Sequence, residues 1–299
     1  MNTLGREDLA KIATALGMRG TPVFRPLPGL SKTITGIVVT GTDSVFVKCA
    51  TSSSEARELV RERAVLEALD GAVGPRLLGA LTLSSGPAIL CEDLSEASWG
   101  SPVPASAARM LAAALERIAA TPVPAPVWPP EWQSDRWAAV AATRMEKLVE
   151  LGVASAAWWE KALPRLIEAE RRVELAGDAL CHGDIWRANI AFAGSGPKGS
   201  GRVSRVVLVD FGDAVRANPD LDRAMAAFLL LGAGRDAAAV APERLGDWGA
   251  LLTGGLALAA TGPAPRWARE PELTRAGQRE GLARAIPLTA ALLRISKPR

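Results

Sequence analysis

The first third of the chain alternates short apolar runs with turn-forming residues. Its β-branched and apolar runs predict four strands, at Thr33–Thr40, Ser44–Cys49, Arg76–Leu83 and Pro87–Glu92. Between the second and third strands, apolar residues recur at helical spacing, which predicts a helix over Ser53–Asp70 with Ser53 or Ser54 as its cap. The apolar face of this helix consists of Leu59, Val60, Leu66 and Leu69.

Helical patterns dominate the rest of the chain. They predict helices over Ser101–Ala120, Asp135–Glu150, Ser155–Leu175 and from Leu221 onward. Pro164 is expected to kink or break the third of these helices. Two strands are expected at Asn189–Ala193 and Arg205–Val209, joined by a Gly- and Ser-rich loop. The predicted fold class is therefore α+β, with an N-terminal helix (1–20), a small β-rich lobe (21–94) and a larger, mostly helical lobe (95–299).

Composition and charge narrow the class of protein. The formal charge of +3 is mild and arginine is spread along the 299 residues, so we expect no nucleic-acid partner. The uncharged runs are shorter than the roughly 20 residues that span a membrane, and no apolar signal segment opens the chain. Three cysteines far apart in sequence are expected to be reduced and buried. Together these features predict a soluble, cytoplasmic protein.

The segment Cys181–Asn189, followed by Val207–Asp213, carries the strongest chemical signal. Asp184 and Asn189 lie five residues apart, and Asp210 follows an apolar run 21 residues after Asn189. Phosphoryl transfer needs a carboxylate to take the acceptor proton and oxygen ligands to hold Mg²⁺. Asp184 is the predicted base, and Asn189 and Asp210 are the predicted metal ligands. His182, the one histidine of the chain, is predicted to support the loop through hydrogen bonds from its ring.

A lysine in an apolar strand is the second signal. Lys48 ends the run Val45-Phe46-Val47, and a carboxylate from the following helix could hold it toward the phosphates of a nucleotide. Glu62 is the favoured partner, and Glu58, one turn earlier on nearly the same face, is the reserve. The alternative is a solvated lysine on an edge strand, which is the more common reading of the strand taken alone.

Two weaker signals point to nucleotide contacts. The turn that contains Gly29 and Ser31 could direct backbone N–H groups and hydroxyls at phosphate, although a plain hairpin turn fits equally well. The Glu92 carbonyl and the Leu94 N–H, after the last strand of the small lobe, are placed to bind an adenine ring. An ordinary linker with solvated acids is the alternative there.

Tryptophan is abundant, with nine residues, and tyrosine is absent. Most of the tryptophans lie in predicted helices, where packing is the default. Trp186 differs because it follows Asp184 by two residues, so it either contacts the substrate or packs beneath the loop. Packing is the favoured alternative.

These residues, in this order, resemble the aminoglycoside phosphotransferase and choline kinase-like family, whose signature is H-G-D-x-x-x-x-N. The resemblance runs from about Pro28 to Phe228, and its specific core is His182–Asn189 with Asp210–Gly212. It implies a two-lobed, protein-kinase-like fold and a small-molecule kinase that uses Mg²⁺ and ATP, with GTP left open. It also implies that Lys48 pairs with Glu62 and that Asp222 braces the catalytic loop.

The acceptor is a small-molecule hydroxyl whose identity the sequence leaves open. An antibiotic of the aminoglycoside type or another type leads, and a metabolite of the choline, ethanolamine, amino-sugar or fructosamine type follows. A catalytically silent binding module is the rival class, but Lys48, Asp184, Asn189 and Asp210 are all intact. Either a monomer or a homodimer is compatible with the sequence.

Side chains of the predicted large lobe bear on the acceptor. Its acids are Glu131, Asp135, Glu160, Glu270, Glu272 and Glu280, and its candidate aromatic faces are Trp132, Trp137, Trp158, Trp159 and Trp267. Most of these acids lie beside Arg or Lys, which indicates solvated faces rather than an acidic bowl. We therefore expect an acceptor with at most one or two amines.

Overall fold

The computed structural model describes residues 3–29, 32–99, 103–104, 106–130, 135–194, 203–263 and 268–298. The chain forms two compact units. The first unit contains Met1–Trp128 and Asp178–Arg216, and the second contains Pro129–Gly177 and Ala217–Arg299. The segment with Asp184 and Asp210 therefore belongs to the same unit as the N-terminal sheet. The functional division into lobes at residue 94 stays a prediction.

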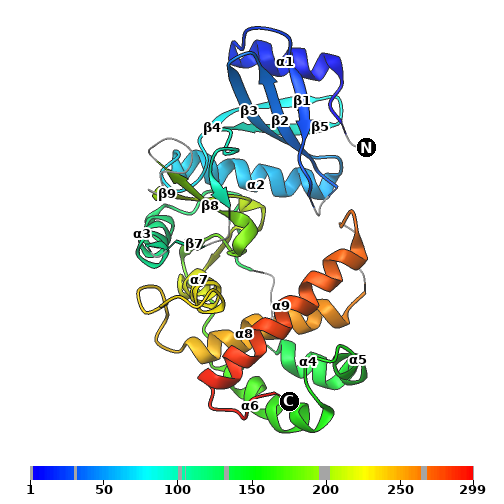
Figure 1. The fold of residues 1–299 in the computed structure, drawn as a ribbon, viewed down its shortest axis with the longest axis vertical. Coiled ribbons are helices and arrows are strands. Elements are labelled where there is room, and N and C mark those ends of the chain that lie inside the picture. The colour runs from blue at the N-terminus through cyan, green and yellow to red at the C-terminus, as the bar shows by residue number, and fades with distance from the viewer. Residues whose placement is uncertain are drawn as a thin grey trace. The chain divides into compact units, whose positions relative to one another are not determined.

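The first unit contains an antiparallel five-stranded sheet near the N-terminus (Figure 1). Its strand order is β1-β2-β3-β5-β4. Its strands are β1 (Val23–Pro26), β2 (Ile34–Thr40), β3 (Asp43–Cys49), β4 (Leu77–Leu83) and β5 (Gly86–Cys91). In β3, Val45, Val47 and Cys49 are buried against α1 (Arg6–Leu16), whose Ile12 joins the same apolar cluster. Because side chains alternate along a strand, Lys48 lies on the opposite face. The sequence patterns missed β1, a short edge strand that is largely exposed.

Helix α2 (Ser53–Leu69) corrects two details of the sequence prediction. Its cap is Ser52 and not Ser53 or Ser54, because the Ser52 hydroxyl accepts the N–H of Glu55 three positions later. Val60 is 52% exposed, whereas Glu62 is buried in the stripe that contains Leu59, Val65, Leu66 and Leu69. A carboxylate thus occupies a position of the inward-facing stripe.

The first unit continues with short elements around a β-hairpin. These are β6 (Ser98–Trp99), α3 (Ala107–Ala120), β7 (Ala179–Cys181), η1 (Arg187–Asn189), β8 (Ile190–Gly194), β9 (Val203–Leu208), η2 (Phe211–Asp213) and β10 (Val215–Ala217), whose last residue belongs to the second unit. Strand β8 pairs with β9 and with β6, and β7 pairs with β10. Helix α3 begins at Ala107, later than the predicted Ser101. The three cysteines all lie in described parts of this unit; they are buried, and no disulfide joins them.

The described helices of the second unit are α4 (Arg136–Thr143), α5 (Met145–Glu150), α6 (Ala156–Arg171), α7 (Asp220–Gly232), α8 (Leu245–Thr261) and α9 (Pro271–Leu292). The single helix predicted over Asp135–Glu150 is wrong, because the backbone of Arg144 leaves the helical region. Pro164 does not break α6. One side of that helix is buried along its whole length, and such packing outweighs the loss of a single backbone hydrogen bond.

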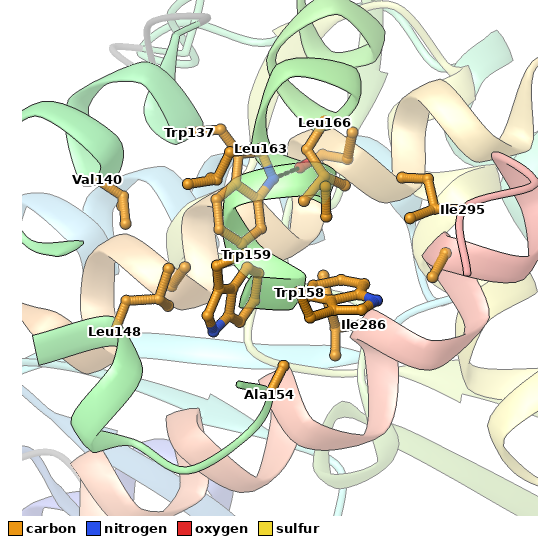
Figure 2. Packing of buried hydrophobic residues seen from close by; sticks show 14 of the residues in the cluster. Trp137, Val140, Leu148, Ala154, Trp158, Trp159, Leu163, Leu166, Ile286 and Ile295 are labelled. Carbon is orange, nitrogen blue, oxygen red and sulfur yellow. Dashed lines mark hydrogen bonds between the residues drawn. The ribbon is translucent and has the colours of Figure 1, made fainter. Parts of the chain in front are cut away.

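Tryptophans of α4 and α6 form the core of the second unit (Figure 2). Trp137 and Trp159 are completely buried, and their ring centroids lie 5.5 Å apart. Trp158 is 6% exposed and meets Trp159 edge to face. The indole N–H of Trp137 donates to the Ala250 carbonyl at 2.8 Å. These three rings pack within the core, which confirms the default prediction for tryptophans in helices, and the alternative that they provide aromatic faces for the acceptor is wrong.

No helix in the described part of the chain is both long and apolar enough to cross a membrane. Of the other predicted acceptor residues, Glu131, Trp132 and Trp267 lie outside the described residues.

Candidate active site

Lys48 lies between two carboxylates within the first unit. Its Nζ is 2.6 Å from Glu62 Oε2 and 2.6 Å from Asp210 Oδ1. The Glu62 side chain is 6% exposed and that of Asp210 is 54% exposed, so only the first of these pairs is buried. The partner of Lys48 is thus Glu62 and not the reserve candidate Glu58. Burial alone lowers the pKa of Lys48, but the charges of Glu62 and Asp210 more than offset this and raise it, which keeps the amine protonated.

Asp210 begins a tight turn after β9. Its backbone φ of 67° lies in the left-handed region, which is uncommon for a residue other than glycine and typical of functional sites. The next residue, Phe211, is buried and donates its backbone N–H to Glu62. Burial raises the pKa of Asp210, but Lys48 more than offsets this and lowers it. The lysine thus keeps this carboxylate ionised.

The loop after β7 is held by His182, which is completely buried. Its Nε2 lies 2.9 Å from the Val209 carbonyl, and its Nδ1 lies 3.3 Å from the Asp184 backbone N–H. Burial lowers the pKa of His182 to about 4, so the ring is neutral near pH 7. With the proton on Nε2, the ring donates to Val209 and accepts from Asp184, and so links the end of β9 to the loop.

The backbone conformation between His182 and Asp184 requires a glycine at position 183. Its φ of 79° disfavours other residues, and a Cβ at this position would lie 2.5 Å from the Asp213 carbonyl oxygen. The loop therefore packs directly against the backbone of the turn that follows Asp210.

Asn189 fixes the carboxylate of Asp184. Its Nδ2 donates to the Asp184 backbone carbonyl and to Asp184 Oδ2, both at 2.9 Å. Burial raises the pKa of Asp184 to about 7, with further contributions from Asp213 and Asp210, while hydrogen bonds from Asn189 and Trp186 oppose the rise. A carboxylate with a pKa near 7 is suited to accepting a proton at neutral pH.

Hairpin register brings the two predicted metal ligands to the same end of the hairpin. Ile190 pairs with Leu208, and the Val209 N–H donates to the Asn189 carbonyl at 3.0 Å, so Asp210 follows directly beside Asn189. The hydrogen bonds described above use Asn189 Nδ2 and Asp210 Oδ1, which leaves Asn189 Oδ1 and Asp210 Oδ2 as hard oxygen donors. This donor set fits Mg²⁺, which is usually bound by one or two protein ligands plus phosphate and water. Within the described residues no group of three or more His, Cys, Asp or Glu forms a metal site by itself.

Trp186 remains 46% exposed, and its side chain forms a hydrogen bond with Asp184. The favoured alternative, packing beneath the loop, is therefore wrong. The indole N–H of Trp186 is bonded to Asp184, while much of the ring stays accessible.

Of the four residues predicted to contact the nucleotide, the structure describes Gly29, Glu92 and Leu94. Gly29 lies next to Thr35, which is the cross-strand partner of Lys48, whereas Ser31 lies outside the described residues. After β5, the Glu92 side chain lies between Arg76, at 3.2 Å, and Arg205. Within the described chain, the Glu92 carbonyl and the Leu94 N–H make no hydrogen bond.

Asp222 is 3% exposed and lies in the first turn of α7, in the second unit. Its bracing of the catalytic loop stays a prediction.

The sequence analysis missed two residues of the site, Arg61 and Asp213, and gave Glu58 a different role. Arg61 Nη1 donates to the Gly212 carbonyl at 2.8 Å, and Glu58 lies against Gly212 instead of Lys48. Asp213 adds a carboxylate whose charge raises the pKa of Asp184. Two sequence features could have indicated them: Arg61 directly precedes Glu62 in the predicted helix, and Asp213 directly follows Asp210-Phe211-Gly212.

A lysine held by a helix carboxylate, a loop with Asp and Asn, and an Asp-Phe-Gly turn define a kinase-type phosphotransferase site. The family comparison agrees: the model of the phosphotransferase enzyme family matches residues 25–258, and the chain belongs to this family. The resemblance noted from the sequence is thereby confirmed, and the protein is a small-molecule phosphotransferase. No curated protein sequence matches the chain.

Solved structures share the fold at low sequence identity. Spectinomycin phosphotransferase APH(9)-Ia, in complex with ADP and spectinomycin, aligns with a TM-score of 0.59 and 11% identity over 95% of this chain and 98% of its own. A choline/ethanolamine kinase family protein from Mesorhizobium loti aligns with a TM-score of 0.56 and 15% identity over 96% and 97%. A thermostable mutant of aminoglycoside phosphotransferase APH(4)-Ia aligns with a TM-score of 0.55 and 12% identity over 96% and 98%. The predicted α+β, protein-kinase-like fold is confirmed.

Proposed function

We propose that this protein transfers the γ-phosphoryl group of ATP to a hydroxyl of a small molecule. The observation that carries the proposal is the arrangement around Asp184. This carboxylate has a pKa near 7, is oriented by Asn189, and belongs to the same unit as the Lys48–Glu62 pair. A solvated edge-strand lysine or an unrelated loop would not place these groups together.

In the proposed reaction Asp184 accepts the proton of the acceptor hydroxyl as its oxygen attacks the γ-phosphorus. The bond from that phosphorus to the β,γ-bridging oxygen breaks, and ADP leaves. Lys48, held by Glu62, offsets the negative charge of the phosphates. Gly29 and Ser31 contact the phosphates, and the Glu92 carbonyl with the Leu94 N–H binds the base. Adenine and guanine differ at the atoms that these two groups would meet, so either ATP or GTP is the donor.

Asn189 and Asp210 are the residues that would hold Mg²⁺. When bound, the ion neutralises charge on the β- and γ-phosphate oxygens. The support for this assignment is the chemistry of the donors, one amide oxygen and one carboxylate oxygen at adjoining positions of the hairpin end.

An antibiotic is the leading acceptor class, with an acceptor that carries at most one or two amines. Three of the acids that could bind further amines are already paired with arginine: Asp135 with Arg171, Glu272 with Arg275 and Glu280 with Arg284. The spectinomycin and APH(4)-Ia structures support the antibiotic class by fold. The choline kinase-like structure supports the alternative, a choline, ethanolamine or amino-sugar kinase, in the same way.

The exposed ring of Trp186 is proposed as an acceptor contact. It lies beside the base, and an aromatic face suits a sugar ring or a single cationic amine. A polycationic acceptor would need several free carboxylates instead.

The test is an assay of ADP or GDP release with Mg-ATP and Mg-GTP across a compound panel. The panel contains spectinomycin, hygromycin B, tobramycin, choline, ethanolamine and amino sugars, and Asp184→Asn is the matched inactive control. We expect one acceptor other than tobramycin to give a kcat/KM of at least about 10⁴ M⁻¹s⁻¹, and the variant to lose it. The proposal fails if neither nucleotide raises the melting temperature at millimolar concentration, because a ligand of the folded state must stabilise it. That outcome would favour a silent binding module.

A further inference from the structure

Helix α2 binds the turn after β9 through two consecutive side chains. Glu62 accepts the backbone N–H of Phe211, and Arg61 Nη1 donates to the Gly212 carbonyl at 2.8 Å. Two peptide groups of the three-residue turn η2 are thus bound to one helix. The Glu62 contact follows from its pairing with Lys48, whereas nothing in the phosphotransfer chemistry described above requires an arginine at position 61.

Charge gives Arg61 a second reason to lie here. The turn contains Asp210 and Asp213, and a Cβ at Gly212 would be 3.6 Å from the Cβ of Glu58. Burial and Asp210 raise the pKa of Asp213, and the positive charge of Arg61 opposes this rise. Arg61 therefore brings a cation to a place where three carboxylates would otherwise repel one another.

The far side of the turn contacts the catalytic loop. The Asp213 carbonyl oxygen lies so close to Gly183 that a Cβ at that position would be only 2.5 Å from it. A shift of the turn would therefore displace the neighbour of Asp184 as well as Asp210. The turn therefore contacts α2 on one side and the loop that contains Asp184 on the other.

We propose that Arg61 is a positioning residue that holds the Asp210–Asp213 turn on α2, and through it the carboxylate of Asp210. Its action is exerted through the Gly212 carbonyl and its charge. The consequence for metal and nucleotide binding rests on the proposed function, whereas the tether itself does not.

The tether is tested by amide hydrogen exchange of the ligand-free protein. Arg61→Met keeps the apolar stem but removes the donor and the charge, and Arg61→Lys keeps the charge and a donor. Arg63→Met is the matched control, because the Arg63 side chain is 52% exposed on the same helix and, among the described residues, its one ion pair is with Glu67 at 2.8 Å. We expect exchange in the peptide that contains Phe211–Asp213 to become up to about tenfold faster in Arg61→Met, the scale of one hydrogen bond. Arg61→Lys should restore most of the protection, and Arg63→Met should match the parent. If Arg61→Met left the amide exchange of this peptide unchanged, the proposal would be overturned, and this result does not depend on which ligand the protein binds.

The positioning role is tested by titrating Mg²⁺ in the presence of ATP and following nucleotide affinity. Arg61→Met should need a several-fold higher Mg²⁺ concentration for half-maximal effect, while Arg63→Met should not. A faster exchange with an unchanged Mg²⁺ requirement would show a merely structural tether and overturn the positioning role. If the parent itself binds neither Mg-ATP nor Mg-GTP, the proposed function fails, and the exchange result still decides whether Arg61 holds the turn.

Discussion

Replacement of Lys48 by Met tests the electrostatics of the site through stability as well as activity. Met keeps an unbranched apolar stem but removes the cation that lies 2.6 Å from both Glu62 and Asp210. The Asp210 side chain is 54% exposed, so losing that pair costs at most about 1 kcal/mol. The Glu62 side chain is 6% exposed, and a buried carboxylate left without its partner costs about 3–5 kcal/mol. Near pH 8 we therefore expect the free energy of unfolding to fall by about 3–5 kcal/mol, mostly because of Glu62.

The sign of the pH dependence separates this cause from a simple packing defect. Burial raises the pKa of Glu62, and in the variant no lysine opposes it. When the pKa of a carboxyl is higher in the folded than in the unfolded protein, the folded protein is most stable with that carboxyl protonated. The free energy of unfolding therefore falls as the pH rises from the pKa of the unfolded state toward that of the folded state. The slope is about 1.4 kcal/mol per pH unit, so the deficit should grow by up to about 4 kcal/mol between pH 5 and pH 8.

The measurement is urea denaturation of the parent, Lys48→Met and the double variant Lys48→Met/Glu62→Leu at several pH values. The double variant removes both buried charges and should recover most of the stability and lose the extra pH dependence, although it stays inactive. Lys161→Met, at an exposed position of α6, is the control. An Lys48→Met deficit below about 1 kcal/mol at pH 8, or one that is equal at pH 5 and pH 8, would refute the reasoning.

Three further predictions address the base and two buried carboxylates. Asp184→Asn should lower kcat by about 10²–10⁴ while Mg-ATP still raises the melting temperature, and near-full turnover would contradict its role as base. Asp8 accepts the Ser84 N–H at 2.8 Å and its hydroxyl at 2.5 Å; burial raises the pKa of Asp8, but these bonds more than offset this and lower it. Asp8→Asn should therefore cost about 1.5–3 kcal/mol at pH 7 by urea denaturation, and an equal cost at pH 3 would be inconsistent, because this stability disappears as the carboxyl protonates. Glu170, with no exposed surface, accepts the first two backbone N–H groups of α4, so Glu170→Ala should cost about 2–5 kcal/mol in thermal unfolding, against little for the exposed Glu168→Ala.

The reactive segment could be predicted from the spacing of a few residues along the sequence. Asp184 and Asn189 lie in one short loop, and Asp210 follows at the end of the same hairpin, so residues near in sequence are also near in space. The Lys48 pairing was predictable for a related reason, since a strand and the next helix along the chain pack together. The preference for Glu62 over Glu58 is confirmed, but its physical reason needed the structure, which shows that Glu62 belongs to the buried stripe of α2 while Val60 does not.

Contacts between distant segments were beyond the sequence. The hydrogen bond from Arg61 to Gly212 spans 151 positions, and that from Trp137 to Ala250 spans 113. No periodicity encodes such partners, so the sequence predicted packing as the default for the three tryptophans of α4 and α6 but left a role as aromatic faces for the acceptor open. Their burial decided for the core.

The sequence by itself therefore determined the chemistry of the site, because a base, two oxygen ligands and a lysine are recognisable as residue types at fixed spacing. It also determined the α+β character, because side-chain periodicity follows from backbone geometry. Only the tertiary structure decided how that chemistry is tuned. The pKa of Asp184 depends on burial and on the charge of Asp213, and the position of Asp210 depends on α2, which lies far away in the chain. Both depend on distances through space, which folding sets and sequence spacing does not.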